Sequence, residues 1–302
     1  MTNIVVGYPM NKAGNLYING LALSYLSTAN IFVTAGAARD NTDQCDIVIP
    51  AAGQTAIITN GGLNGLDTGT VADSTLYYVF VVGSSLAANP DINIQTQVST
   101  LASGSSVLNG TVISEGTVTP PTWSVNNNYQ PGVLFSLSPT APTLPEGYDM
   151  FRRIGAVLTD GSAHILEFWQ GPAWNDASRW MWYDAPVSVL SATPEAAFTS
   201  LALTAAVPPA AVQYPTVGTM VKLQVDLDPA AAADFVAFRP TGSTNAGGQV
   251  KVSGAVATVH EFAVVDVFAT LNTAAPPELS IDYITDASST VALHVIAYVD
   301  NL

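Results

Sequence analysis

The stretch VKLQVDL, at residues 221–227, is the clearest indication of the fold in this sequence. Apolar residues occupy its odd-numbered positions, and Lys222, Gln224 and Asp226 stand between them. Because successive side chains of a β-strand point to opposite faces of the sheet, this alternation predicts a strand with one buried face and one face toward solvent. Half-buried strands of this kind are typical of antiparallel sheets.

The rest of the chain repeats short apolar runs that end at Gly, Asn, Asp or Pro. The strongest of them is LYYVFVV at residues 76–82, which is rich in aromatic and β-branched residues and is followed by Gly83. Helical pattern is scarce: residues 193–198 and 229–233 are two short candidates, each with a proline behind a capping residue. Many short strands with frequent turns predict an all-β protein of the sandwich or barrel type.

The length of 302 residues suggests roughly two domains. Residues 186–215 are rich in Pro, Ala, Ser and Thr and show no strong alternation, which is typical of a linker. We therefore expect two antiparallel, jelly-roll-like β-sandwich domains joined by this linker. The first is a β-rich module over residues 1–185, and the second is a C-terminal sandwich over residues 216–302.

Charge excludes several classes of partner. The chain has 8 basic and 23 acidic residues and a net charge of −15, whereas a phosphate backbone or an anionic membrane surface needs clustered cations. No basic-then-apolar leader and no apolar window of about 18 residues is found, so neither a secretory signal nor membrane insertion is expected. The single cysteine, Cys45, excludes an internal disulfide, so stability is expected from packing or assembly.

No enzyme signature is present. The sequence has no nucleophile elbow, P-loop or dinucleotide-binding motif. The histidines lie singly, without the spacing of zinc ligands, and the nearby carboxylates Asp160 and Glu167 are a weak glycosidase signal. We therefore expect no catalytic residue and no cofactor. The acidic run at residues 40–46 leaves a calcium site and a polar turn open as alternatives, because calcium takes oxygen ligands but the run lacks the glycine and glutamate of an EF-hand loop.

Tryptophan is concentrated in one place, since four of the five tryptophans fall within residues 169–182. On a strand, Trp180 and Trp182 would share one face, and Arg179, Met181 and Tyr183 would share the other. Exposed aromatic side chains stack on sugars or anchor interfaces, whereas buried ones build a core. The candidate contact residues are Trp169, Trp174, Trp180 and Trp182.

Three motifs follow one another in the first half of the chain. NGLDTGTVA at residues 64–72 precedes the aromatic run TLYYVF, LSPTAPTLPEGY covers residues 137–148, and FRRIGAVLTDG covers residues 151–161. In this order they resemble a module of tailed-bacteriophage and prophage virion proteins, over roughly residues 15–185. The resemblance implies a β-rich component of a tail fibre or tail-associated structure, with a role in assembly or host contact, and names no catalytic residue.

Two adjacent arginines in the last motif are further interface candidates. Arg152 and Arg153 are two of only five arginines in the chain. On a strand they point to opposite faces, so we expect at least one of them to pair with a carboxylate or a carbonyl at an interface.

These observations predict a non-enzymatic structural protein of a tailed-phage virion: a fibre, tail-tip or collar component. We expect a homotrimer, because three chains can bury edges and apolar stripes jointly. The expected partners are further copies of the chain, other virion proteins and a glycan or protein of the host surface. The expected location is the tail or head surface of the virion, after synthesis in the bacterial cytoplasm. A capsid decoration protein and a carbohydrate-binding module are the alternatives.

Overall fold

The protein is all-β, as expected from its sequence. The computed structural model describes residues 17–43, 45–84, 107–108, 111–112, 130–175, 178–191, 194–208, 218–271, 278–286 and 288–302. Within these ranges the regular elements are all strands, and most of them pair antiparallel in large sheets. The described residues contain no helix that is long and apolar enough to cross a membrane.

The expectation of two short helices is wrong for the residues that can be judged. Residues 229–233 form turns, in which Ala233 has a φ of 71° and the Asp234 carboxylate accepts the backbone N–H of Ala231. Residues 194–198 are likewise not helical, and residue 193 lies outside the described residues. Both segments are too short to repay the cost of nucleating a helix, so turn hydrogen bonds prevail.

The first half of the chain forms a four-stranded sheet of order β12-β8-β11-β7, a three-stranded sheet of order β1-β4-β5, and one end of a much longer sheet. The four-stranded sheet is antiparallel except for the parallel pair β11–β7. The strands are β1 (Ile18–Gly20), β2 (Leu23–Ser27), β3 (Asn30–Val33), β4 (Gly36–Arg39), β5 (Asp46–Ile49), β6 (Gln54–Ile57), β7 (Gly65–Leu66), β8 (Leu76–Gly83), β9 (Val107–Leu108), β10 (Thr111–Val112), β11 (Gly132–Ser136) and β12 (Met150–Leu158).

β8 is an inner strand of the four-stranded sheet and is buried on both faces. Tyr77, Val79 and Val81 belong to the main core, whereas Tyr78 and Phe80 pack in a second, smaller cluster on the opposite face. This is the burial expected of an uninterrupted apolar run rather than an alternating one.

The second half is a two-layer arrangement. Strands β14, β21, β16 and β19 form one layer, and β15, β20, β17 and β18 form the other. β19 passes from one layer to the other, because it pairs with β16 along most of its length and with β20 only at Thr270 and Leu271. The strands are β13 (Phe168–Asn175), β14 (Ser178–Ser191), β15 (Thr199–Ala202), β16 (Thr219–Asp228), β17 (Phe235–Pro240), β18 (Val250–Ser253), β19 (Glu261–Leu271), β20 (Leu279–Thr285) and β21 (Thr290–Asn301).

The alternating stretch at residues 221–227 lies in β16, at the middle of this layer. Its odd-numbered side chains are fully buried against the second layer, and its polar side chains are only partly buried, which confirms the expected half-buried strand. β16 lies between β19 and β21 and pairs antiparallel with both.

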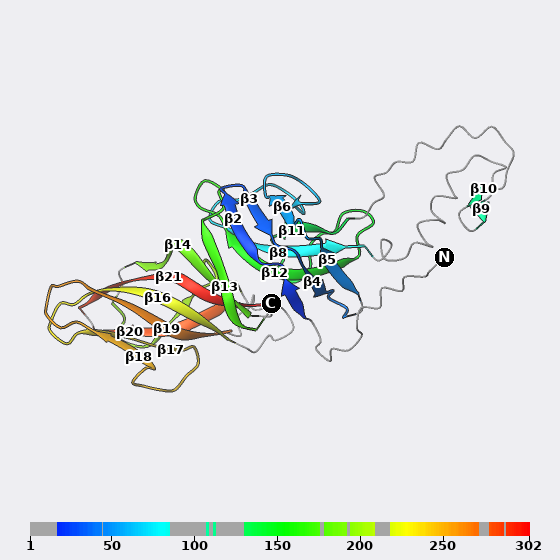
Figure 1. The fold of residues 1–302 in the computed structure, drawn as a ribbon. Coiled ribbons are helices and arrows are strands. Elements are labelled where there is room, and N and C mark those ends of the chain that lie inside the picture. Colours follow the sequence, from blue (N-terminus) through cyan, green and yellow to red (C-terminus); the bar gives the residue numbers. More distant parts are fainter. Residues whose placement is uncertain are drawn as a thin grey trace.

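The long strand β14 joins the two halves through hydrogen-bonded sheet. It pairs with β13 along one edge and with β21 along the other, and β13 in turn pairs with β2. Figure 1 shows β13 where the blue-to-green strands of the first half meet the yellow-to-red strands of the second. The stretch expected as a linker, residues 186–215, therefore contributes the end of β14 and all of β15, while residues 209–215 lie outside the described residues.

Candidate interaction surface

The two arginines predicted as interface residues lie inside the protein. Arg152 and Arg153 on β12 are both buried. Arg153 Nη2 donates to Asp300 Oδ1 on β21 at 2.6 Å, with both side chains almost fully buried, and its guanidinium lies 4.8 Å from the centre of the Tyr78 ring. The Arg153–Asp300 ion pair therefore joins the first half of the chain to the second inside the protein. Neither Arg152 nor Arg153 is an exposed cation.

Burial sets the electrostatics of this joint. Desolvation raises the pKa of Asp300, and the nearby cations Arg153 and Arg179 oppose this rise. Desolvation also lowers the pKa of Arg152, with a further lowering from the neighbouring Arg153. Because both side chains are buried, removal of either would leave the other without its partner inside the protein, so the pair is a structural contact whose loss would be costly.

Arg179 is a third buried arginine, for which the sequence predicted a face of the strand but no contact. Its guanidinium donates to the carbonyls of Gly20 and Leu21 and to Gln170 Oε1, at 2.8 Å for Leu21 and 3.1 Å for Gln170. Gly20 and Leu21 lie in the turn between β1 and β2, and both have positive φ, at 69° and 57°, which is strained for Leu21. By binding their carbonyls, Arg179 holds this turn against β14. The sequence signal for its burial was its position next to Trp180, because adjacent residues of a strand point to opposite faces of the sheet.

The tryptophans lie on the other face of β14. Trp180 and Trp182 share that face, with ring centroids 5.9 Å apart, while Arg179, Met181 and Tyr183 are buried on the opposite one, as the alternation predicted. Trp169 on β13 is directly opposite Trp182 in the register, and the two are 52% and 37% exposed. Trp174 lies near the end of β13, where side chains are outside the described part of the structure.

The same face continues across the layer. Trp182 is opposite Ala297, Ala297 is opposite Lys222, and Lys222 is opposite Asp266 on β19. Lys222 Nζ lies 5.8 Å from the ring centres of both Trp180 and Trp182 and 2.6 Å from Asp266 Oδ1. The lysine therefore bridges the indole rings and a carboxylate, which orders the middle of this face.

The far side of the face is β19, which is apolar on both sides. Ala263, Val265, Val267 and Ala269 face the core, yet the side chains between them are also mostly apolar. Phe262, Val264 and Phe268 are 67%, 58% and 38% exposed. Exposed apolar side chains gathered on one surface mark a contact site more often than scattered ones do. We call this surface the outer face: Trp169, Trp180, Trp182, Lys222, Phe262, Val264, Asp266 and Phe268.

His260, the residue before β19, borders the outer face. Its Nδ1 lies 3.2 Å from Asp226 Oδ1, and its Nε2 lies 3.8 Å from Asp228 Oδ2. The hydrogen bond with Asp226, followed by the charge of Asp228, raises the pKa of His260. The protonated, cationic form is thereby favoured at this end of β19.

The acidic run at residues 40–46 is organised by the chain itself. Asp40 is buried, and its two carboxylate oxygens accept the Cys45 N–H at 2.9 Å and the Thr42 hydroxyl at 2.5 Å. Arg39 Nε lies 3.6 Å from Asp43 and 3.2 Å from Asp46, so a protein cation sits among these carboxylates. Among the described residues no group of His, Cys, Asp and Glu is arranged to hold a metal. The contacts are those of a polar turn leading into β5.

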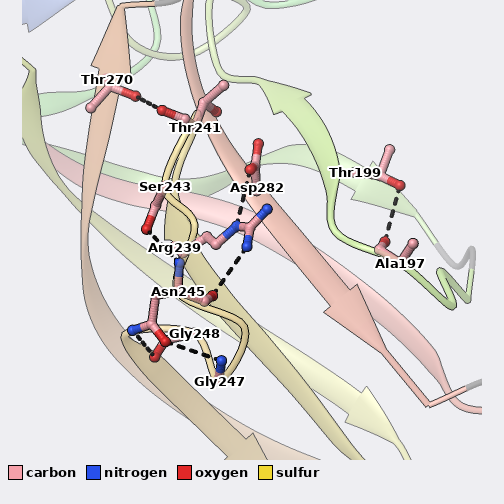
Figure 2. Close-up of polar contacts among 10 residues, drawn as sticks. All are labelled: Ala197, Thr199, Arg239, Thr241, Ser243, Asn245, Gly247, Gly248, Thr270 and Asp282. Carbon is pink, nitrogen blue, oxygen red and sulfur yellow. Dashed lines mark hydrogen bonds and ion pairs between the residues drawn. The ribbon is translucent and has the colours of Figure 1, made fainter.

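A second polar cluster fixes the loop between β17 and β18 (Figure 2). Arg239 Nε lies 3.1 Å from Asp282 Oδ2, and its Nη1 donates to the Asn245 carbonyl at 3.1 Å. The guanidinium also stacks 3.8 Å from the centre of the Phe198 ring. Asn245 Nδ2 in turn donates to the Gly248 carbonyl at 2.9 Å. Through these contacts Arg239 fixes the conformation of the loop between β17 and β18.

Comparisons with known proteins give little further information. No family model and no curated protein matches the chain. Two solved structures of infectious bursal disease virus were found: that of the Gx strain, at 9% identity over 96% of this chain and 67% of the other, with a TM-score of 0.16, and a mutant VP2 protein from derived T=1 particles, at 10% identity over 96% and 72%, with a TM-score of 0.18. Likenesses this weak carry no argument for this chain.

Proposed function

We propose that this chain is a non-enzymatic structural protein of a tailed-phage virion, and that it works by binding further copies of itself and neighbouring virion proteins. The observation that carries the proposal is the outer face. β19 buries one apolar side and exposes another, so the fold completes its burial only in contact with a partner.

The buried charges support a mechanical rather than a catalytic role. Arg153 pairs with Asp300 across the two halves, and Arg179 serves backbone carbonyls at a strained turn. Groups used in this way fix the relation of strands to one another instead of facing a substrate. The order of motifs in the first half, which resembles tailed-phage virion modules, supplies the phage context of the proposal.

Labelling of intact particles tests the proposal. Purified particles of the phage or prophage that encodes this chain are incubated with gold-labelled antibodies raised against it. Labelling of the tail, its tip or the collar is the expected result, whereas labelling over the head would favour the capsid decoration alternative. Particles without label, although the chain is present in the infected cell, would contradict a virion role.

One observation favours carbohydrate binding as a second candidate function. Trp169 and Trp182 are cross-strand neighbours and both expose their rings, which is an arrangement suited to stacking on a sugar. A glycan array probed with the whole chain tests this candidate. Binding that Trp169→Ala abolishes would support it, and the absence of any bound glycan would remove it.

A further inference from the structure

We propose that β19 pairs edge to edge with β19 of a second copy, in an antiparallel arrangement centred on Ala263. This inference deepens the proposed function and rests on it, because it names the partner of the outer face as the same chain. Its evidence is the free edge of β19, the residues that this edge presents, and the pattern of charge and apolar side chains along it.

The edge of β19 is open in the described structure. β19 pairs with β16 over nine consecutive positions, from Glu261 to Ala269, without a register shift. Its other neighbour, β20, pairs only with Thr270 and Leu271. No further strand in the described ranges pairs with β19 along residues 261–269, so one side of a regular strand keeps backbone groups available for another strand.

This edge also lacks the usual protection against pairing. Natural edge strands are kept short, bulged, or interrupted by lysine and proline. β19 has 11 residues without a bulge against β16, and it contains no Lys, Arg, Pro or Gly. The edge strands β6, β15 and β18, in contrast, have four residues each. The length and composition of β19 therefore fit an edge that is meant to pair.

The side chains select the register. With Ala263 opposite its twin, residues 261–265 of the two strands face each other, and Phe262 of one copy lies opposite Val264 of the other. His260, the residue before β19, then lies opposite Asp266 of the other copy. Moving the centre to Val264 would instead place Phe262 opposite Asp266. Only the first of these two registers matches apolar with apolar residues and an imidazole with a carboxylate, and cross-strand pairs of both kinds stabilise a sheet.

Neighbouring charges extend this complementarity. In one copy Asp266 is bound to Lys222, and in the other His260 is bound to Asp226. Across the proposed seam these groups would form a row from Lys222 through Asp266 and His260 to Asp226, which alternates in sign when His260 is protonated. Such alternation favours the correct register and partner.

The symmetry of this contact differs from the trimer expected from the sequence. A strand that pairs with its own twin forms an isologous contact, which closes as a two-fold dimer. A dimer, or an assembly built from dimers, is therefore the expected state. The three-fold symmetry of a trimeric fibre would need a contact through a different surface of the chain.

A substitution at the exposed middle of β19 tests the contact. The mass of the full chain in solution is measured by sedimentation over a range of concentrations for the wild type, Val264→Lys and the control Leu137→Lys. Val264 and Leu137 are 58% and 55% exposed, and Leu137 lies after β11, away from β19. We expect a dimer for the wild type and the control, and at least about tenfold weaker association for Val264→Lys. A monomeric or trimeric wild type, or equal association of the two variants, would overturn the inference.

A cysteine substitution tests the register independently and does not depend on how Val264→Lys folds. In a Cys45→Ser background, Ala263→Cys would place two thiols opposite each other. Cα atoms of opposed antiparallel residues are about 4.5–5.5 Å apart, within the range of a disulfide. Mild oxidation is expected to give a covalent dimer for Ala263→Cys and none for Leu137→Cys. A lack of cross-linking by Ala263→Cys would refute this register.

These outcomes separate the inference from the proposed function. A chain that is found in particles but is monomeric or trimeric in solution would contradict the β19 contact alone. A chain that forms the cross-linked dimer but is absent from particles would contradict the virion role alone.

Discussion

Arg153 and Asp300 show how single residues join distant parts of this chain. They are separated by 147 positions in the sequence, and their buried ion pair links β12 to β21. The sequence predicted that at least one of the two adjacent arginines would pair with a carboxylate or a carbonyl at an interface, whereas the carboxylate found is buried inside the chain. It could not indicate which carboxylate, because that depends on how the two halves pack.

Removal of one partner of this pair should be strongly destabilising. Asp300→Ala leaves the Arg153 charge buried without its carboxylate, and we expect a loss of about 3–5 kcal/mol in the free energy of unfolding. Asp43→Ala, at the partly exposed pair with Arg39, should cost about 1 kcal/mol or less. Urea denaturation measures both values. Similar losses for the two variants would show that burial does not govern this joint.

The pKa of His260 gives a second test at the level of residues. Asp226 and Asp228 raise this pKa, so protonated His260 stabilises the folded state at low pH, and this contribution is lost as the pH rises through the raised value. The effect on stability should be small, because the imidazole is exposed. An NMR titration should give a pKa above that of an ordinary histidine, and Asp226→Asn should lower it.

The matched control for this titration is Asp160→Asn, which removes a carboxylate in the first half of the chain and should leave the His260 titration unchanged. If Asp226→Asn and Asp160→Asn have the same effect on His260, the contact with Asp226 is not the cause of the shift.

At the level of elements, position in the sheet should decide the cost of losing an aromatic ring. Phe80 on β8 is 1% exposed in the smaller core, whereas Trp169 on β13 is 52% exposed. We expect Phe80→Ala to cost about 3–5 kcal/mol in stability and Trp169→Ala much less. Denaturation midpoints measure the difference. A larger loss for Trp169→Ala would mean that the outer face is already packed against something within the chain.

The sequence predicted the strands better than it predicted their surroundings. The alternation of residues 221–227 predicted both the strand β16 and its half-burial, and the apolar run at residues 76–82 predicted the strand β8. The exposure of β19 could not be predicted, because apolar residues on both sides of a strand look the same in the sequence whether the second side meets a core or solvent. The two helices were overestimated, because capping residues cannot compensate for very short segments.

At the level of the whole molecule, β14 makes the two halves share sheet and core. Its pairing with both β13 and β21 is supplemented by the Arg153–Asp300 pair and by the Tyr183 and Tyr298 rings, whose centroids are 5.9 Å apart. The proline- and alanine-rich composition of residues 186–215 could not reveal this pairing, since sheet continuation depends on partners distant in sequence.

This continuity predicts that the two halves unfold together. Tryptophan fluorescence reports mainly on the junction, because four of the five tryptophans lie within residues 169–182, and far-UV circular dichroism reports on all sheets. We expect the two signals to give coincident unfolding transitions, because opening the junction exposes core in both halves. Two separated transitions would show that each half is stable without the other.

The most direct test of the account is the number of copies of this chain in a purified virion. Quantitative mass spectrometry of particles from the phage proposed to encode the chain, calibrated against a major capsid protein, gives this number. We predict a fixed set of several copies, in an even number if β19 pairs as proposed. Particles that are complete and infectious yet contain no copy of the chain would contradict its proposed role as a structural protein of the virion.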